Sequence, residues 1–285
     1  MGTTRVKRAL IVGWDGVRDD ERRAARTPHL DGLAAQGFEA TVRVHEANPT
    51  ISGPVWTTVA TGVHSDRHGV LHNDLRPHDH AALPDVLTLI RRADRAATTY
   101  AAAGWAPLVT ADSGGPLFAD GDSYYPVAPD GADKLAAQAA MDVDVVARTI
   151  SELRDRDHSA VFSYVGLPDE IGHAEGVTAR YRASIEICDD YLGSLLEAID
   201  ARTSRADEDW LIVVTTDHGH RDEGDHGGDS DEERSAWLVA AGPGVVASCG
   251  SGVDHADIPV TVLDFLGVEI DGDLAGRPFG LRDTR

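Results

Sequence analysis

The sequence predicts an α/β protein in which a mostly parallel central sheet is covered by helices on both faces. Short apolar runs of strand length alternate along the chain with longer amphipathic stretches of helix length. Alternating strands and helices predict parallel pairing. Two parallel neighbours need a long connection, and this connection is usually a helix that crosses one face of the sheet. Apolar residues make up 42% of the chain, which is an ordinary fraction for a globular protein with a buried core.

Each predicted strand is a short apolar run that ends at polar residues or glycine. The first run ends at Trp14, Asp15 and Gly16, and the run that ends at Thr216 is rich in β-branched residues. The runs that we interpret as strands are 9–13, 42–45, 98–103, 160–165, 210–216 and 237–241.

The predicted helices are recognised by their periodicity and by proline or glycine at their ends. Pro28 and Gly37 bound the first helix, while Gly62 closes a helix that follows Ser52 and Pro54. The stretches that we interpret as helices are 28–37, 54–61, 83–93, 136–154, 180–201 and 258–266.

The segment 107–133 differs from the rest of the chain. It is rich in Gly, Pro, Asp and Ser and shows no periodicity, which is typical of a long loop or a small cap over a functional site. The chain has no internal repeat and no recognisable linker. We therefore predict one catalytic domain over residues 1–285, with a small loop-rich cap within about 73–133.

The net charge and the amino-terminal residues indicate which binding partners and which cellular location to expect. The formal net charge of −22 argues against a nucleic acid polymer as partner, although bound cations reverse the potential locally. Residues 1–8 are polar and do not resemble a signal peptide, and no apolar run is long enough to span a bilayer. We expect a cytoplasmic protein without a membrane partner, of undetermined oligomeric state.

Three aspartates, Asp15, Asp169 and Asp217, lie at or just beyond the ends of apolar strands. Because ligands of parallel sheets bind beyond the carboxyl ends of the strands, we expect these carboxylates to gather at one edge of the sheet. Each aspartate alone is as compatible with a turn as with a site. Their joint occurrence indicates a site for cations.

Histidines accompany these carboxylates at spacings that favour shared ligation. His218 follows Asp217 directly, and His173 shares a helix face with Asp169 if Pro168 begins a helical turn. His226 lies in a glycine-rich loop that can fold back. Mixed His and Asp ligation suits Zn²⁺, with Mn²⁺ or Fe²⁺ as alternatives. Two such cations bind both oxygens of a displacement at phosphorus, so we predict a metal-dependent hydrolase of phosphate esters.

Ser52 is the candidate nucleophile. Its position before a predicted helix adds backbone N–H groups and a positive dipole end, which favour a phosphoryl group. The competing interpretation is that Ser52 only caps this helix. Thr50 is a second, weaker candidate for the nucleophile.

With these residues in place, the chain resembles the alkaline phosphatase superfamily, and within it the type I phosphodiesterase/nucleotide pyrophosphatase branch. The likeness runs from the first strand almost to the end of the chain. The matching segments are 12–16, 49–54 with 61–62, 68–69, 169–173, 216–219, 226–228, 257–267 and 276–278.

The resemblance implies two divalent metal ions, a covalent phosphoserine and two successive displacements. One ion would be held by Asp169, His173 and His226. The other would be held by Asp15, Asp217 and His218, together with the oxygen of Ser52. Ser52 stands where the family has its Thr or Ser nucleophile, and metal coordination is one way to activate a hydroxyl that ionises poorly.

The chain departs from the family at one phosphoryl contact. The branch places an Asn after the proline of the nucleophile segment, where this chain has Val55. The short cap region also implies an open site. Trp56 and His220 are candidate substrate contacts, although core packing is the alternative for the tryptophan.

Three functions are compatible with these residues. The first is a phosphodiesterase or nucleotide pyrophosphatase that acts on a small-molecule phosphate ester. The alternative is a phosphomonoesterase, which needs additional cationic donors, for which Arg18, Arg67 and Arg76 are candidates. The third is a metal-binding protein that has lost catalysis. The sequence after Ser52 argues against a sulfatase, because it lacks the arginine of the sulfatase motif.

Overall fold

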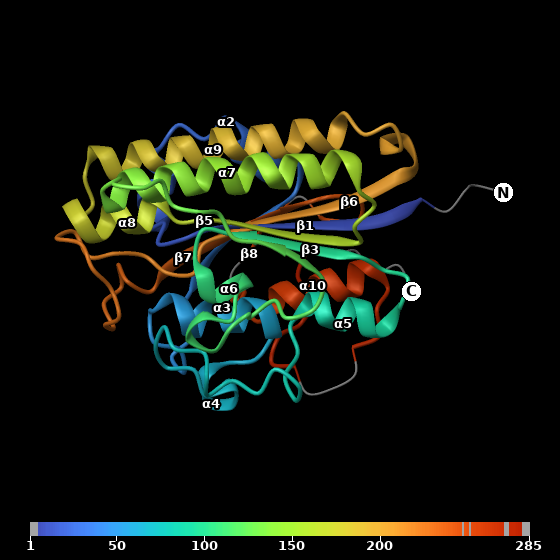
Figure 1. Cartoon of the computed structure of the whole chain (residues 1–285), viewed down its shortest axis with the longest axis horizontal. Coiled ribbons are helices and arrows are strands. Elements are labelled where there is room, and N and C mark those ends of the chain that lie inside the picture. The colour runs from blue at the N-terminus through green and yellow to red at the C-terminus, as the bar shows by residue number, and fades with distance from the viewer. Residues whose placement is uncertain (1–4, 247, 251, 271–273, 281–285) are drawn as a thin grey trace.

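The structure is a computed structural model, and it describes residues 5–246, 248–250, 252–270 and 274–280. A central sheet of eight strands separates two helical layers (Figure 1), in the order β4-β3-β5-β1-β6-β7-β2-β8. The strands are β1 (Val6–Trp14), β2 (Phe38–Arg43), β3 (Thr99–Ala103), β4 (Asp122–Tyr124), β5 (Ala160–Val165), β6 (Glu208–Thr215), β7 (Ser235–Ala241) and β8 (Ser248–Gly250).

The pairing confirms the prediction of a mostly parallel sheet. Strand β1 pairs in parallel with β5 on one side and with β6 on the other. Strand β7 is antiparallel to both of its neighbours, β6 and β2. Among the described residues this is the strand that reverses direction.

Helices cover both faces of the sheet. In Figure 1, α2, α7 and α9 lie on one face, and α3, α5 and α10 lie on the other. The helices are α1 (Asp19–Ala24), α2 (Pro28–Gln36), α3 (Ser52–Thr61), α4 (Ser65–His68), α5 (Val86–Ala93), α6 (Ala106–Val109), α7 (Lys134–Asp155), α8 (Leu167–Glu175), α9 (Ala179–Asp200) and α10 (Asp257–Leu266). Within the described residues, none of them combines the length and the apolar character that crossing a bilayer requires.

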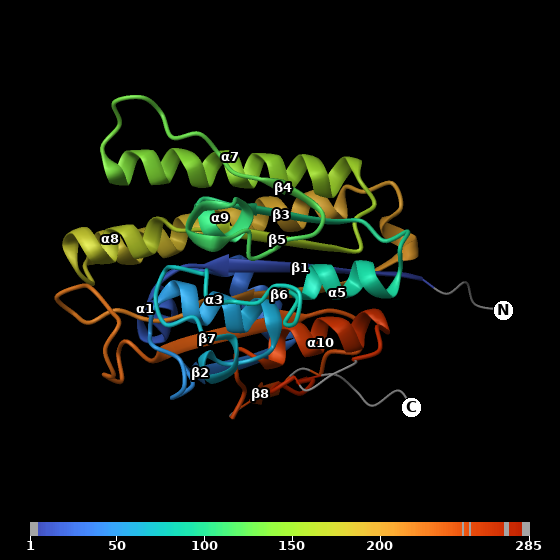
Figure 2. The same ribbon diagram turned by 60° about the horizontal axis from the view of Figure 1, so that its bottom comes forward.

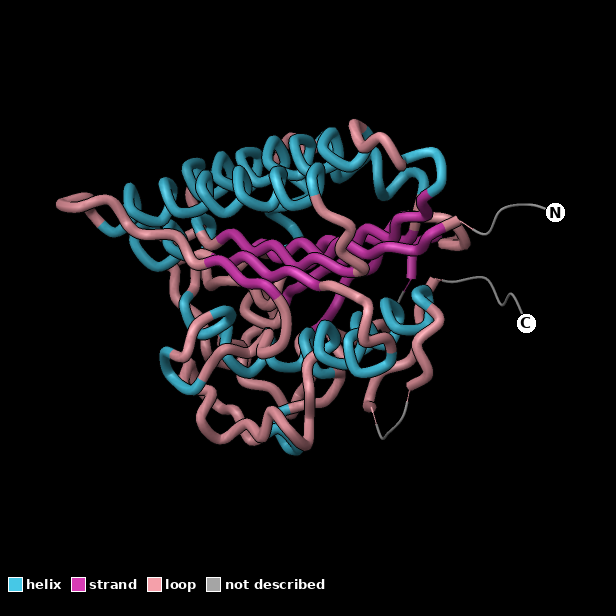
Figure 3. The backbone as a smooth tube through the Cα atoms, turned by 45° about the vertical axis from the view of Figure 1, so that its right-hand side comes forward, coloured by secondary structure: helices cyan, strands magenta, loops and turns pink. Residues whose placement is uncertain are grey.

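Strand β1 shows why its sequence is a continuous apolar run. Successive side chains of a strand point to opposite faces. Leu10 and Val12 pack into the core beneath α7 and α9, whereas Ala9 and Ile11 pack into the core on the side of α3 and α10. A strand that is buried on both faces needs apolar residues at every position. Figure 3 shows the sheet enclosed in this way between two layers of helices.

The predicted elements are all present, with shifted ends. The predicted strand 42–45 is β2 and begins at Phe38, because its pairing with β7 starts opposite Ala240. The predicted helix 83–93 begins only at Val86, because the carboxylate of Asp85 caps it.

The predicted long loop 107–133 contains strand β4 at the sheet edge. Figure 2 shows the connection from β4 looping out beside the first turn of α7. Helices α1 and α4 and strands β4 and β8 are not evident from periodicity, since each has six residues or fewer.

A buried ion network fixes the start of β6. The carboxylate of Glu208 accepts hydrogen bonds from Arg8 Nε at 2.8 Å, from Arg202 Nε at 2.8 Å and from Trp210 Nε1 at 2.8 Å. The side chain of Glu208 is almost completely buried. Burial by itself raises the pKa of this carboxyl, but the donors, led by Arg202, outweigh it and lower the pKa from 4.5 to about 2.

Glu208→Gln is expected to lower the free energy of unfolding by about 3 kcal/mol, because two guanidinium groups lose their buried anionic partner. Urea denaturation at neutral pH measures the loss. Glu197→Gln, at an exposed position of α9, is the matched control and is expected to have almost no effect. Because the folded pKa of Glu208 is depressed, its contribution is complete above about pH 4.5 and is lost as the pH falls towards 2. Equal stability of the two variants at pH 7 contradicts this account.

Candidate active site and metal centre

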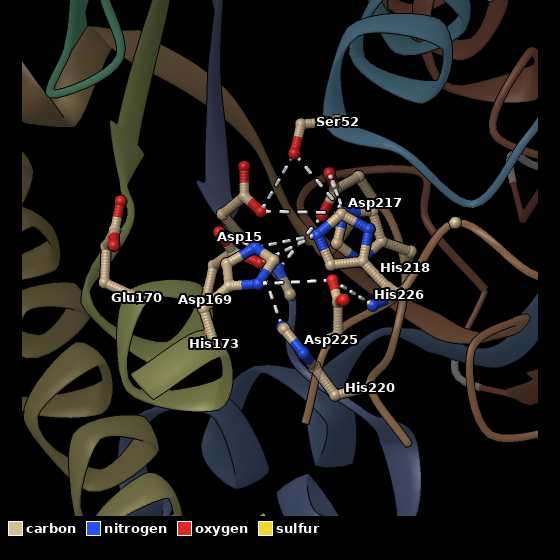
Figure 4. Close-up of polar contacts among 12 residues, drawn as sticks. Asp15, Ser52, Asp169, Glu170, His173, Asp217, His218, His220, Asp225 and His226 are labelled. Atoms are coloured by element: carbon tan, nitrogen blue, oxygen red, sulfur yellow. Dashed lines mark hydrogen bonds and ion pairs between the residues drawn. The ribbon is translucent and has the colours of Figure 1, made fainter. Parts of the chain in front are cut away.

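The three aspartates meet at the carboxyl edge of the sheet. Asp15 follows β1 directly, Asp217 follows β6, and Asp169 lies in the first turn of α8, which follows β5. These strands are neighbours in the order β5-β1-β6, so their ends lie side by side. The backbone N–H of Gly16 donates to Asp217 Oδ1 at 3.0 Å, which joins the ends of β1 and β6. Figure 4 shows the resulting cluster.

One group of possible ligands consists of Asp15, Asp217 and His218. One ligand atom from each residue lies within 4.8 Å of the others, and all three residues are buried. Ser52 Oγ lies 3.4 Å from Asp15 Oδ1 and 3.3 Å from His218 Nε2. The structure therefore brings the predicted nucleophile and the three predicted ligands of one ion together.

A second group surrounds Asp169. Ligand atoms of Asp169, His218, His220 and His226 lie within 4.8 Å of one another. His173 Nε2 lies 3.4 Å from Asp169 Oδ2 and 3.0 Å from His226 Nε2. His226 contacts the carbonyl oxygen of Thr50 through Nδ1 at 2.7 Å, so Nδ1 carries a proton and a neutral ring keeps its lone pair on Nε2. The three residues predicted to hold the other ion thus contact one another.

Two carboxylates of this cluster, those of Asp15 and Asp217, are placed unfavourably without a cation. Burial, followed by the charge of Asp169, raises the pKa of Asp15 to about 7. Burial and then the charge of Asp15 raise the pKa of Asp217 well above its ordinary value. Asp217 Oδ2 is buried without a hydrogen-bond partner. Carboxylates and imidazoles of this kind are ligands of divalent cations such as Zn²⁺, so the residues fit such ions.

Ser52 does not cap its helix. Ile51 occupies the cap position of α3, and Ser52 is the first helical residue. Its hydroxyl is directed at Asp15 and His218, which removes the interpretation of Ser52 as a simple cap. The alternative nucleophile, Thr50, donates to the carbonyl of Gly228 at 2.9 Å and accepts from the N–H of Gly227. Thr50 therefore holds the loop that carries His226.

Trp56 and His220 lie beneath the site, although the sequence pattern made them candidate substrate contacts. Both side chains are fully buried. Trp56 Nε1 donates to Asp15 Oδ2 at 2.9 Å, and Tyr164 donates to the same oxygen at 2.6 Å. His220 Nε2 lies 2.9 Å from Asp169 Oδ1. In this structure both residues orient carboxylates, as residues behind metal ligands commonly do.

Glycine at position 16 makes room for this arrangement. A Cβ atom there would lie 2.7 Å from Asp169 Oδ1 and 2.8 Å from His220 Nε2. The φ angle of Gly16 is +66°, which favours glycine in addition. A side chain at this position would displace both the carboxylate and its supporting imidazole.

A cavity of about 290 Å³ opens beside Ser52. A larger cavity of about 800 Å³ lies near α5 and α10, but its lining contains none of the predicted ligands. The smaller cavity is therefore the candidate active site. The residues that line it, besides Asp169, His173 and His226, are Ser52, Asn73, Trp105, Lys134, Gln138, Tyr164, Gly166 and Glu170.

Sequence reasoning missed Asn73. Its Oδ1 accepts the backbone N–H of Gly53 at 2.9 Å, which leaves the amide N–H groups to donate to a ligand beside Ser52. The amide was expected at position 55, but Val55 is completely buried in the core. The side-chain amide that lines the cavity beside Ser52 thus comes from a loop and not from helix α3. One feature of the sequence points to Asn73: it lies four residues after Gly69, and Gly69 ends one of the segments that match the family.

The arginines that a monoester would require are engaged elsewhere. Arg18 pairs with Asp20 and Asp222. Arg76 pairs with Asp74 at the surface, and Arg67 lines the larger cavity. Among the described residues that line the cavity at Ser52, the side chain with a fixed positive charge is that of Lys134.

Comparison with known proteins agrees with the geometry. The chain is 27% identical over 232 residues to rat ectonucleotide pyrophosphatase/phosphodiesterase family member 7, a match that covers 74% of this chain and 49% of the relative. It is 25% identical to GPI ethanolamine phosphate transferase 2 of Aspergillus fumigatus, over 83% of this chain and 30% of that protein. The chain thus spans about half the length, or less, of these curated relatives.

Solved structures share the fold at low sequence identity. Murine ectonucleotide pyrophosphatase/phosphodiesterase 5, in complex with AMP, superposes with a TM-score of 0.69 at 16% identity, over 94% of this chain and 97% of that chain. A putative sulfatase from Bacteroides thetaiotaomicron superposes with a TM-score of 0.75 at 15% identity, over 96% and 73% of the two chains. Both likenesses show that this chain shares the fold of these proteins.

The family itself is identified by sequence. Residues 9–233 match the family described as type I phosphodiesterase/nucleotide pyrophosphatase. This range begins in β1 and includes all seven residues of the two predicted metal sites. The chain therefore belongs to the type I phosphodiesterase/nucleotide pyrophosphatase family.

Proposed function

We propose that the protein is a metal-dependent phosphodiesterase that uses Ser52 as its nucleophile on a small-molecule substrate. The observation that carries this proposal is the position of Ser52, whose Oγ lies within 3.4 Å of both Asp15 and His218 and which lines the cavity. The names of the relatives, which describe activities on phosphate diesters and pyrophosphates, support the same class.

Two cations are part of the proposal. Asp169, His173 and His226 would hold one of them. Asp15, Asp217 and His218 would hold the other, near the hydroxyl of Ser52. When bound, such a pair activates the attacking hydroxyl and stabilises the leaving oxygen at phosphorus.

The residues of the chain then have distinct tasks in the first displacement. Ser52 Oγ forms the new bond to phosphorus while the bond to the leaving alcohol breaks, which gives a phosphoserine. The hydroxyl proton passes to water in the cavity, since an ion held by Asp15, Asp217 and His218 would favour the ionised form of Ser52. The positive end of α3 and the amide of Asn73 face the phosphoryl oxygens. This phosphoserine keeps the second substituent of the diester. Water then cleaves the bond between phosphorus and Ser52 Oγ, which releases a phosphomonoester and restores Ser52.

The lining of the cavity favours a diester over a monoester. A monoester carries a third charged oxygen, which needs additional cationic donors. The three arginines that could have supplied them are engaged away from the cavity. Trp105 instead offers an aromatic surface for a second substituent.

The test is a comparison of turnover with Zn²⁺ or Mn²⁺ on three reporters: bis-p-nitrophenyl phosphate, thymidine 5′-p-nitrophenyl phosphate and p-nitrophenyl phosphate. We expect kcat/KM to be higher for both diesters than for the monoester. A clear preference for p-nitrophenyl phosphate would show that the protein is a phosphomonoesterase. No turnover of any reporter would contradict hydrolysis as such.

Asn73→Asp is expected to lower kcat for bis-p-nitrophenyl phosphate about a hundredfold, which is typical of losing one hydrogen-bond donor to the reacting oxygen. The variant keeps an oxygen that accepts the N–H of Gly53, so the loop is expected to stay in place. Steady-state rates measure the loss, and an unchanged melting temperature shows that the fold is intact. An Asn73→Asp variant with the rates of the natural protein would exclude the amide from the reaction.

A further inference from the structure

The loop that carries His226 begins with a tight turn over residues 221–225, and this turn packs directly against α8. Gly224 has a φ angle of +94°, which favours glycine. A Cβ atom at Gly224 would lie 2.4 Å from the carbonyl oxygen of Gly172, so the two backbones are in close contact. The turn is therefore held next to His173, which follows Gly172 in α8.

Asp225 has an unusual backbone conformation at the end of this turn. Its φ angle is +68°, in the left-handed region that residues other than glycine rarely adopt. Among the described residues, Ser113 is the other non-glycine residue with a positive φ angle. A side chain that is kept at such a position often has a functional reason. The carboxylate of Asp225 is therefore the feature that needs an explanation.

This carboxylate contacts both histidines that we propose as ligands of one ion. Asp225 Oδ1 lies 3.5 Å from His173 Nδ1 and accepts the backbone N–H of His226 at 3.0 Å. Figure 4 shows Asp225 beside these two residues. The other ring nitrogen of His173, Nε2, lies 3.4 Å from Asp169 Oδ2 and 3.0 Å from His226 Nε2. Because an ionised carboxylate accepts and does not donate, Asp225 favours a proton on Nδ1, which leaves the lone pair of Nε2 for a cation.

The two candidate ion sites also differ in charge. Asp15 and Asp217 give one site two carboxylates, whereas Asp169 is the one carboxylate among the proposed ligands of the other ion. Asp225 brings a second carboxylate to this other site, next to the ring of His173. A negative charge near a cation favours its binding. Because the side chain of Asp225 is 65% exposed, water and salt weaken this attraction without abolishing it.

We propose that Asp225 is a positioning residue for the ion beside Asp169. Its carboxylate keeps the proton of His173 on Nδ1 and adds a second negative charge near this ion. The inference rests on the proposed metal-dependent function. It concerns a residue outside the ligand sets, since the groups of converging ligand atoms found in the described part of the chain do not include Asp225.

The competing interpretation is that Asp225 only shapes the turn. Its Oδ1 would then serve the N–H of His226, and its Oδ2 would serve the guanidinium of Arg221, which lies 3.9 Å away. Asparagine also adopts left-handed conformations, and its side-chain oxygen accepts the same N–H group. Asp225→Asn therefore preserves the turn and removes the charge. The two interpretations differ in the metal affinity that they predict for this variant.

The test is a calorimetric titration of the full chain with Zn²⁺, after a chelator has removed bound metal. We expect the natural protein to bind two ions, and Asp225→Asn to raise the dissociation constant of one of them by roughly ten- to a hundredfold. Glu223→Gln is the matched control, because it removes a negative charge at an exposed position of the same turn. It is expected to leave both dissociation constants unchanged. The melting temperature of metal-free Asp225→Asn should not fall below that of the natural protein.

Two further variants assign the effect to one ion. Asp217→Asn is expected to keep the ion beside Asp169, so adding Asp225→Asn to it should weaken the remaining ion by the same factor. Asp169→Asn is expected to keep the other ion, and adding Asp225→Asn to it should then change nothing. A residue that acts only on the turn would not discriminate between the two backgrounds.

Each other outcome overturns the inference. Two ions bound by Asp225→Asn with natural affinities show that the carboxylate has no role in binding, while the proposed metal centre stands. Equal weakening of both ions, or a lower melting temperature of the metal-free variant, shows a residue that shapes the turn. Absence of Zn²⁺ binding to the natural protein rejects the metal centre and this inference together.

Discussion

Replacing Ser52 by alanine is expected to lower kcat for bis-p-nitrophenyl phosphate by about a thousandfold or more, since loss of an attacking nucleophile removes most of the chemical rate enhancement. Tyr164, which also brings a hydroxyl to this cavity, uses it to donate to Asp15 Oδ2. Thr50, the alternative in the sequence, is committed to the loop at Gly227 and Gly228. Residual hydrolysis would then come from water alone.

The measurement combines rates with detection of the covalent species. Acid quenching of the natural protein during turnover of bis-p-nitrophenyl phosphate, followed by mass spectrometry, is expected to show a p-nitrophenyl phosphoryl group on Ser52 that Ser52→Ala lacks. Ser52→Thr keeps a hydroxyl and is the conservative control, for which we expect partial activity. Natural rates in Ser52→Ala would remove the serine mechanism, whatever the substrate preference.

The gathering of the three aspartates at one edge of the sheet could be predicted from the sequence, because each of them follows a segment that is clearly a strand. A strand buried on both faces, such as β1 or β5, reads as a short apolar run. Parallel neighbours then bring Asp15, Asp169 and Asp217 to one edge without further information. The same reasoning placed His173, which shares α8 with Asp169.

The remainder of the site depends on contacts that local sequence does not encode. The sequence allowed Trp56 to be either a stacking surface or, as the preferred alternative, a core residue, and in the structure its buried indole donates to Asp15. Asn73 reaches Ser52 from a loop that has no periodicity. The orientation of Gln138 depends on Asp142, one turn along α7, and on the glycine at position 166 in another segment. In each case the deciding partner is set by tertiary packing.

Because the metal ligands are buried by this packing, we expect them to lower the stability of the metal-free protein. Buried carboxylates repel one another, and Asp217 Oδ2 has no hydrogen bond to compensate. Natural proteins retain such groups where function requires them and compensate elsewhere. In this fold the compensation we propose is the bound cations.

Asp217→Asn is therefore expected to weaken metal binding without lowering the stability of the metal-free protein. Without metal, the variant should melt at the same temperature as the natural protein or higher, because a buried charge has been removed. With Zn²⁺ in excess, the natural protein should melt about 10 °C higher, as expected for ions bound far above their dissociation constants. Asp217→Asn should lose a large part of this shift and should bind one ion in place of two.

Differential scanning calorimetry and elemental analysis after dialysis measure these two quantities. Asp169→Asn, in the other group of ligands, should likewise lose one ion. Without metal, however, it should melt below the natural protein, because His173, His220 and His226 contact that carboxylate and hold its pKa well below the ordinary value. Asp264→Asn, at an exposed position of α10, is the control and should keep both ions and the whole shift. Two ions and an undiminished shift in Asp217→Asn would mean that this aspartate is not a ligand, and the pairing of two cations around Ser52 would have to be abandoned.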